Sequence, residues 1–374
     1  MKRTWAAVGL LALLIAVVAV VALSGSPPGD VVLSGSSPGT DHVTDAGTAT
    51  DRLTTAGAGQ SDGTTYTATT PATQQPTSEP VTVAFIGDQG TSEHARAVLR
   101  MIDREDADLV VHSGDFDYYD SPGDWSAMID EELGPDVAYL AVVGNHDRGN
   151  WSGYRPVIEN QTERADNLTC SGDTGLLATC TYRTVTVVQS SMGMCNGQAA
   201  SKYPGLCGEL QSFDQEAYVS QSLSNASTTW RICSFHKVNH AYQVGDKPSD
   251  VPVSMYDTCR RGGAIVATGH DHDYARTYPM ANYSRRTVAS RSPPYTVGPD
   301  ATFAVVSGVA GTSFYSPSEM ARKDWWAKTY TNGSFGAFIC TFRQNGTGEC
   351  YFETADGEVV DGPFAIRSRY GPPT

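Results

Sequence analysis

The ten residues 81–90, Val-Thr-Val-Ala-Phe-Ile-Gly-Asp-Gln-Gly, decide the expected fold. Six apolar or β-branched residues run into a glycine and an aspartate, which is typical of a buried strand that ends in a tight turn. Two more short apolar runs, at 109–112 and 138–143, end in the same way, at Gly114-Asp115 and Gly144-Asn145. This repeated strand ending is the most informative feature of the sequence.

The segments between these runs predict helices. Thr91 or Ser92 is expected as the N-cap of the first helix. Its apolar residues recur at i, i+3, i+4 and i+7, namely Ala95, Val98, Leu99 and Ile102. A second stripe follows Asp124 and consists of Trp125, Met128, Ile129 and Leu133. Alternating strands and helices predict a largely parallel sheet over residues 81–147.

Two later segments have the same form. Residues 230–235 predict an apolar strand that ends at His236, and residues 264–268 predict a strand that ends in Gly269-His270-Asp271-His272. Ligands of α/β sheets bind outside the carboxyl ends of the strands. We therefore expect the polar side chains of five strand ends to meet at one place.

The residues at these ends supply oxygen and nitrogen ligands without a thiolate. They are Asp88, Asp115, Tyr118, Asn145, His236, His270 and His272. Hard oxygens beside imidazoles suit a pair of first-row ions better than calcium or a structural zinc. Seven ligands exceed the need of one ion. A shared Asp115 carboxylate would hold two ions about 3.5–4 Å apart, the arrangement used for in-line displacement at phosphorus.

At these residues the chain resembles the calcineurin-like metallophosphoesterases, and more narrowly the purple acid phosphatases. The matching blocks follow the family order from residue 81 to about 275: Gly87-Asp88-Gln89-Gly90, Gly114-Asp115-Phe116-Asp117-Tyr118, Gly144-Asn145-His146-Asp147, His236, and Gly269-His270-Asp271-His272. The resemblance implies an α/β fold over residues 81–374, an α/β/β/α sandwich of two packed mixed sheets flanked by helices. Residues 302–306, 337–342 and 351–353 are expected as strands of the second sheet.

The resemblance also implies a role for each residue. The first ion, ferric iron, would be held by Asp88, Tyr118 and His272, and the second, a divalent iron, zinc or manganese, by Asn145, His236 and His270, with Asp115 bridging. His146 would protonate the leaving oxygen or bind the phosphoryl group, while a metal-bound hydroxide attacks phosphorus. Weaker candidates for substrate contacts are His240, Arg148, Lys237, Tyr274 and Arg276.

The cysteines favour disulfides. Their number, eight, is even, and the chain has no C-x-x-C pair typical of a zinc site. Close spacing suggests the pairs Cys170–Cys180, Cys195–Cys207 and Cys340–Cys350. In purple acid phosphatases of plants a valine stands where this chain has Cys233, and a disulfide between Cys233 and Cys259 would tie two of the predicted strands together.

The first 80 residues indicate a secretory protein. Lys2 and Arg3 precede an apolar run over residues 5–23, so that residues 1–23 predict either a cleaved signal peptide or an uncleaved type II membrane anchor. Ser, Thr, Gly and Pro make up more than half of residues 24–80, which predicts a disordered stalk. Seven of the ten asparagines lie in N-x-Ser/Thr sequons, at 150, 160, 167, 225, 282, 332 and 345.

A net charge of −15 disfavours non-specific binding to nucleic acid. We expect a secreted or surface-anchored acid phosphatase that hydrolyses small phosphate monoesters. One alternative is a phosphodiesterase or nucleotide pyrophosphatase on the same fold. The other is a surface recognition protein with a vestigial metal site.

Overall fold

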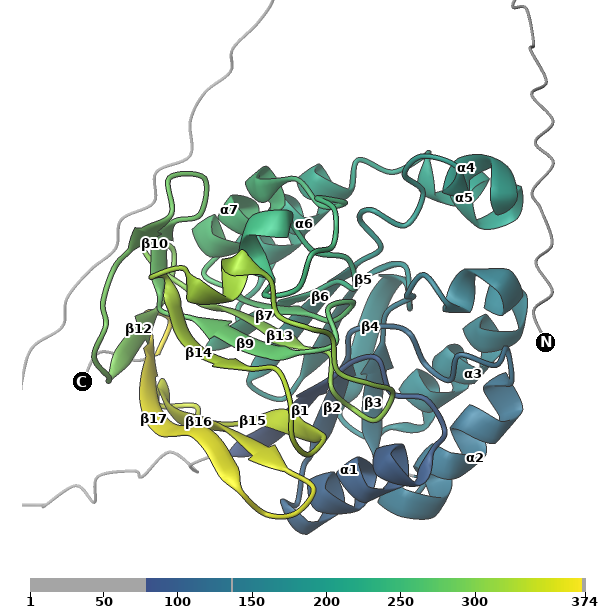
Figure 1. Cartoon of the computed structure of the whole chain (residues 1–374), viewed down its shortest axis with the longest axis horizontal. Helices are drawn as coiled ribbons and strands as arrows, with labels where there is room; N and C mark the ends of the chain where they lie inside the picture. The colour runs from purple at the N-terminus through teal and green to yellow at the C-terminus, as the bar shows by residue number, and fades with distance from the viewer. Residues whose placement is uncertain (1–78, 136, 372–374) are drawn as a thin grey trace, which may run out of the picture. The chain divides into compact units, whose positions relative to one another are not determined.

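The structure, a computed structural model, describes residues 79–371 except 136 (Figure 1). The predicted signal or anchor segment and nearly all of the predicted stalk lie outside the described residues. Within the described part, no helix is both long enough and apolar enough to cross a bilayer.

The first five elements occur in the predicted order. They are β1 (Val81–Ile86), α1 (Glu93–Arg104), β2 (Leu109–His112), α2 (Pro122–Leu133) and β3 (Ala138–Ala141). Ser92 caps α1, because its hydroxyl accepts a hydrogen bond from the Ala95 amide at 3.4 Å. The predicted apolar face of α1 is buried.

The rest of the described chain adds further helices and strands, several of them in consecutive runs of one kind. They are η1 (Asp147–Asn150), α3 (Trp151–Arg164), β4 (Leu168–Asp173), β5 (Leu177–Tyr182), β6 (Val185–Ser190), α4 (Ala199–Lys202), α5 (Pro204–Leu210), α6 (Gln215–Asn225), β7 (Trp230–Ser234), η2 (His240–Tyr242), α7 (Val253–Arg261), β8 (Ile265–Thr268), β9 (Tyr274–Thr277), β10 (Met280–Asn282), β11 (Thr287–Val288), β12 (Tyr295–Val297), β13 (Ala304–Ser307), η3 (Glu319–Arg322), β14 (Trp326–Tyr330), β15 (Gly336–Phe342), β16 (Thr347–Thr354) and β17 (Val359–Ser368).

The described strands form two large mixed sheets and one small hairpin. The first sheet has the order β12-β17-β16-β15-β1-β2-β3, and the second has the order β14-β9-β13-β8-β7-β6-β5-β4. Strands β1, β2 and β3 pair in parallel, as do β6, β7, β8 and β13. The carboxyl ends of β1 to β3 therefore share one edge of the first sheet, and those of β7 and β8 share one edge of the second.

Alternate residues of β1 explain the layers. Val83 and Phe85 belong to the apolar cluster between the two sheets, whereas Ala84 and Ile86 belong to the cluster under α1, α2 and α3. A third cluster packs the second sheet against α6 and α7. Figure 1 shows these helices on the two outer sides of the paired sheets. The expected α/β/β/α sandwich is confirmed, and strands buried on both faces account for the continuous apolar runs.

One expectation about the sheets is wrong. The strands expected at 302–306, 337–342 and 351–353 do not share the second sheet. β13 pairs with β8 in the second sheet, whereas β15 pairs with β1 and β16 in the first. A buried strand pattern specifies two apolar faces but not the neighbouring strand, so the sequence pattern could not assign the sheet.

All eight cysteines are described and paired. The disulfides are Cys170–Cys180, Cys195–Cys207, Cys233–Cys259 and Cys340–Cys350, as predicted. Two of them join neighbouring antiparallel strands, β4 to β5 and β15 to β16, between directly opposed residues. Cys233–Cys259 instead joins β7 to α7, next to the strand end that carries His236.

Candidate metal centre

Four of the seven predicted ligands lie just beyond a strand end with an unusual backbone. Asp88, Asp115, Tyr118 and His270 have φ values of 56°, 59°, 66° and 68°. A positive φ is uncommon outside glycine and costs about 1–3 kcal/mol where it is strained, so such residues cluster at functional sites. These ligand residues therefore make the sharp turns themselves.

The glycines before them serve close packing more than turning. A Cβ on Gly144 would lie 2.1 Å from the Asp115 amide nitrogen, and one on Gly114 would lie 2.8 Å from the Gly144 Cα. Of these two glycines, only Gly114 has a positive φ. The strand ends of β2 and β3 approach so closely that no side chain fits between them.

Asp88, Tyr118 and His272 form one cluster. The Tyr118 hydroxyl lies 3.1 Å from Asp88 Oδ1 and 3.0 Å from His272 Nε2, and that nitrogen is 3.2 Å from Asp88 Oδ1. Three ligand atoms from β1, β2 and β8 loops thus point at one small space. This is the set that the sequence assigns to the first ion.

Asp115, Asn145, His236 and His270 form the second cluster. His236 Nε2 lies 3.3 Å from Asp115 Oδ2 and 3.2 Å from Asn145 Oδ1. Ligand atoms of Asp115, His236 and His270 lie within 4.8 Å of one another, and all three residues are buried. The His236 Nδ1 faces the Ser113 carbonyl at 2.7 Å. This contact makes Nδ1 the donor and turns Nε2 toward the cluster, where the Asp115 carboxylate raises the pKa of the ring against the effect of burial.

The two clusters adjoin. Asp88, from the first cluster, accepts a hydrogen bond on Oδ2 from the backbone amide of His270, from the second, at 2.7 Å. The two clusters are therefore neighbours, as a pair of adjacent ions would require. Among the predicted ligands, Asp115, His236 and His270 form a group that could hold a metal ion, and the other four lie in hydrogen-bond contact with one another or with this group.

The side chain of Asp147 joins the loops that follow β2 and β3. Its buried carboxylate accepts hydrogen bonds from the backbone amides of Asp115, Phe116 and Gly144 at 2.9, 2.8 and 2.6 Å. These bonds fix the β2 loop to the β3 loop. The sequence singled out Asp147 only as the acid after a matching block, and its role in joining the loops emerges from the structure.

Electrostatics keeps two of the ligands neutral in the absence of a cation. Burial and the carboxylates of Asp88 and Asp115 raise the pKa of Tyr118 far above its ordinary value. Burial and the positive charges of His236 and Lys237 lower the pKa of His270 well below its ordinary value. A neutral imidazole has a lone pair to offer, whereas the phenol gives up its proton only to a strongly charged cation.

His146 is placed beside the clusters without belonging to them. Its backbone amide donates to Asp115 Oδ1 at 2.8 Å, and its exposed ring lies 4.5 Å from the Tyr118 ring. Arg148 donates to the Asn145 carbonyl at 3.0 Å and to the Met194 carbonyl at 2.7 Å. The ring of His146 is therefore exposed and accessible to a substrate, whereas two N–H groups of Arg148 are already bonded to backbone carbonyls.

Three further residues around the clusters were not found by sequence reasoning. Tyr315 stacks on the His272 ring at 4.0 Å, and its hydroxyl lies 3.2 Å from His272 Nε2. Ser313 bonds the other ring nitrogen at 2.8 Å, and Lys247 donates to the Tyr315 hydroxyl at 3.2 Å. All three lie in loops without a motif, so the sequence holds no signal for them.

Of the weaker candidates for substrate contacts, some lie at the clusters and others lie away from them. Lys237 lies at the clusters, with its ammonium 2.9 Å from His270 Nε2. His240 faces the Lys247 carbonyl at 3.1 Å and contacts no predicted ligand. Tyr274 and Arg276 point away, because both bond the buried carboxylate of Asp361 between the sheets. The expectation that Tyr274 and Arg276 contact substrate is therefore wrong.

The chain belongs to the calcineurin-like phosphoesterase family, a class of hydrolases. The sequence model of that family matches residues 81–274, just over half of the chain. The matched region contains all seven clustered side chains. Members of the family use a dinuclear metal centre, and the buried oxygen and imidazole donors found here fit such a centre. A search of curated proteins finds no match.

Several solved structures share the fold. A purple acid phosphatase from yellow lupin (Lupinus luteus) seeds aligns with a TM-score of 0.55 and 17% identity, over 79% of this chain and 57% of that chain. GAP50, the anchor in the inner membrane complex of Plasmodium, aligns with a TM-score of 0.50 and 12% identity, over 77% and 88%. PhoD aligns with a TM-score of 0.50 and 11% identity, over 78% and 70%. The described fold thus spans only 57% of the lupin enzyme.

Proposed function

We propose that the protein is a phosphomonoesterase of the secretory pathway that works through two adjacent metal ions. The observation that carries the proposal is the pair of adjoining ligand clusters, one with a phenol and one with an amide oxygen. Asp88, Tyr118 and His272 would hold ferric iron, and Asn145, His236 and His270 a divalent iron, zinc or manganese. Asp115 would bridge the two ions.

The bound ions would supply charge neutralisation and an acidified water. The chain's own residues would orient the ester. The exposed His146 ring would donate a proton to the leaving oxygen, and the bond from its backbone amide to Asp115 supports this role. Lys247 contacts Tyr315, which stacks on His272, and would add a positive charge near the phosphate. Both groups favour a substrate with a doubly charged terminal phosphate.

The preference for a monoester over a diester can be tested by side-by-side turnover. The purified protein should hydrolyse an aryl phosphate monoester faster than the matching diester, with an optimum below pH 7. His146→Ala should lower kcat for the monoester by about 10²- to 10⁴-fold. Faster turnover of the diester would transfer the assignment to phosphodiesterase activity on the same centre.

A recognition protein with a vestigial metal site makes the opposite prediction. Asp115→Ala should abolish both metal binding and hydrolysis, whereas the matched control Asp124→Ala, on the exposed start of α2, should change neither. A protein that binds no metal and hydrolyses neither ester would refute the enzyme assignment. The fold would stand in that case.

A location in the secretory pathway rests on the four disulfides and on the apolar segment at residues 5–23. Disulfides persist in oxidising compartments and are rare in the cytosol. The segment is either a cleaved signal peptide or an uncleaved membrane anchor. Expression of the full chain with a C-terminal tag, followed by N-terminal sequencing of the product, distinguishes these two possibilities. A new N-terminus near residue 24 indicates cleavage, whereas an intact Met1 in the membrane fraction indicates an anchor.

A further inference from the structure

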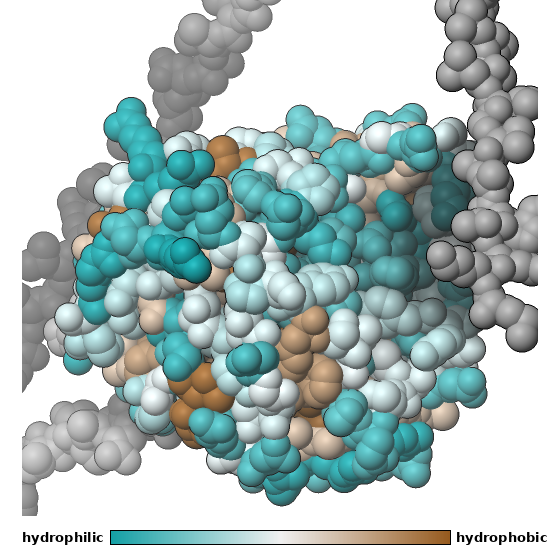
Figure 2. All heavy atoms as spheres, in the orientation of Figure 1, coloured by the Kyte–Doolittle hydropathy of each residue, from teal (hydrophilic) through white to brown (hydrophobic). Residues whose placement is uncertain are grey.

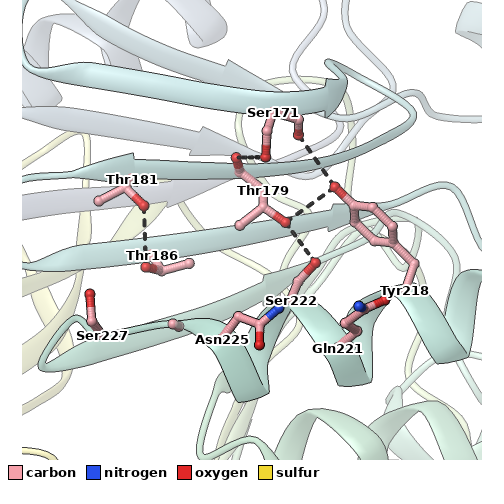
Figure 3. A pocket seen from close by; sticks show the side chains of 10 residues that line it. Ser171, Thr179, Thr181, Thr186, Tyr218, Gln221, Ser222, Asn225 and Ser227 are labelled. Carbon is pink, nitrogen blue, oxygen red and sulfur yellow. Dashed lines mark hydrogen bonds between the residues drawn. The ribbon is translucent and has the colours of Figure 1, made fainter. Parts of the chain in front are cut away.

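A second pocket lies on the outer side of the second sheet, between its edge strands and α6. It measures about 310 Å³ and is lined by ten residues, none with a charged side chain. Figure 3 shows hydroxyls of β5 and β6 on one wall and side chains of α6 on the other. A pocket without charge, in a chain of net charge −15, does not suit a phosphate or a cation. It suits a neutral ligand with many hydroxyl groups.

Hydrogen bonds between β5 and α6 hold the two walls of the pocket together at Thr179. The Thr179 hydroxyl lies 2.8 Å from the Ser222 hydroxyl and 3.2 Å from that of Tyr218. Tyr218 in turn donates to the Ser171 carbonyl at 3.3 Å. The phenol ring is thereby fixed at the rim, where an aromatic face can pack against the apolar face of a sugar ring.

The helix wall has unused hydrogen-bonding groups. Among the described residues, the side chains of Gln221, Asn225 and Ser227 have no hydrogen-bond partner, and Figure 3 shows them along the pocket. All three are exposed. Amide and hydroxyl groups of this kind exchange bonds to water for bonds to sugar hydroxyls.

A complete glycosylation acceptor lines this pocket. Asn225, Ala226 and Ser227 form an N-x-Ser sequon, and all three line the pocket. Asn225 is the last residue of α6, and Ala226 is extended at φ −65° and ψ 129°. The triplet therefore leaves the helix at its acceptor residue.

Two other sequons differ in this respect. Asn160 lies inside α3, so its triplet is helical. The Asn150 side-chain amide already donates to the Asp120 carbonyl at 2.9 Å. Asn225 combines an exposed and unpartnered amide with a neutral pocket directly beside it.

We propose that Asn225 carries an N-linked glycan whose first sugars lie in this pocket. A transferase would supply the glycan from a lipid-pyrophosphate oligosaccharide donor. The Asn225 Nδ2 forms a bond to C1 of the first sugar, the bond between C1 and the pyrophosphate oxygen breaks, the lipid pyrophosphate leaves, and the amide gives up one proton. The inference is independent of the proposed phosphatase activity.

Glycopeptide mass spectrometry of the full chain from a eukaryotic secretory host tests the modification. The peptide with Asn225 should carry a glycan, and Ser227→Ala should remove it. The matched control Ser224→Ala, three positions earlier in the chain and also exposed, should keep it. An unmodified Asn225 overturns the proposal, whether or not the other sequons carry sugar.

Release of the glycan by an amidase from the folded protein tests its place in the pocket. Release at Asn225 should be at least about tenfold slower than at Asn345, because pocket contacts must first break. Asn345 lies in the turn between β15 and β16. Gln221→Ala and Tyr218→Ala should each speed release at Asn225, whereas Gln211→Ala, exposed at the end of α5, should not. Equal rates at both sites in the wild-type protein would overturn the pocket assignment.

Discussion

Tyr118 is the residue at which the proposed ferric ion can be tested. Tyr118→Phe should remove the visible absorption band that a ferric ion gains from a phenolate ligand, while the melting temperature stays within a few degrees. Burial and two carboxylates hold the pKa of Tyr118 high, so a strongly charged cation is needed to displace its proton. Visible spectroscopy of the purified protein measures this directly.

Tyr119 provides the control for that variant. It neighbours Tyr118 but is 75% exposed, so Tyr119→Phe should leave the band unchanged. A band that survives in the Tyr118→Phe protein would show that another group supplies the colour. A colourless but fully active wild-type protein would exclude iron and leave the ligand clusters in place.

Asp147 should contribute to stability more than its place in the sequence indicates. Asp147→Ala leaves three buried backbone amides without an acceptor, and we expect the free energy of unfolding to fall by about 2–4 kcal/mol. Urea unfolding of the metal-free protein measures the change. Asp103→Ala, exposed on α1, should change it by less than about 0.5 kcal/mol. Equal effects would show that the loops do not depend on this carboxylate.

At the scale of residues, the proximity of the proposed ligands could be expected from the sequence, because they follow strand ends and several come directly after a glycine. A local pattern therefore identified Asp88, Asp115, Asn145 and His270 directly. Tyr315 could not be found in this way. Tyr315 lies 43 positions after His272 in the chain, and only the tertiary fold brings the two rings into contact.

The β7–α7 disulfide lies close to the strand end that carries His236 of the second cluster. Cys233–Cys259 ties β7 to α7 three residues before His236. A double Cys233→Ala/Cys259→Ala variant should lower the free energy of unfolding by about 2–4 kcal/mol. It should also release metal to a chelator several-fold faster, because the strand end that carries His236 loses its tie to the helix.

The edge disulfide offers a matched comparison. Cys170→Ala/Cys180→Ala removes a bond between β4 and β5 at the edge of the same sheet. Stability should fall, but the rate of metal release should stay at the wild-type value. If both variants release metal equally fast, the loss is a general effect of lower stability.

Individual strands could be predicted where the sequence shows both an apolar run and the turn residues at its ends. Strands β1 and β2 begin and end at the predicted residues. The pairing of β15 with β1 was not predictable, because these strands lie some 250 positions apart and both read as buried apolar runs. A strand pattern reports burial on its faces and carries no information on its neighbours.

The joint between the two sheets is a feature of the whole molecule. Arg276 in β9 makes two hydrogen bonds to Asp361 in β17, at 2.7 and 2.9 Å, and Tyr274 adds a third at 2.6 Å. Asp361→Ala leaves a buried guanidinium without its partner, so the free energy of unfolding should fall by about 3–5 kcal/mol. Asp300→Ala removes an exposed pair with Arg369 and should cost less than about 1 kcal/mol. A small effect of Asp361→Ala would mean that water replaces the carboxylate.

In the described part of the chain, five strand ends from two sheets bring polar side chains into contact. On the face shown in Figure 2, hydrophobic residues gather only in small separate patches. Function is therefore expected at the metal centre and not on a broad apolar surface of that face.

Metal analysis of the purified protein tests the central claim most directly. Elemental mass spectrometry should find two transition-metal ions per chain, at least one of them iron, and Asp115→Ala should lose both because it removes the shared ligand. One ion or none per chain, in protein that still hydrolyses phosphate esters at the full rate, would contradict the account.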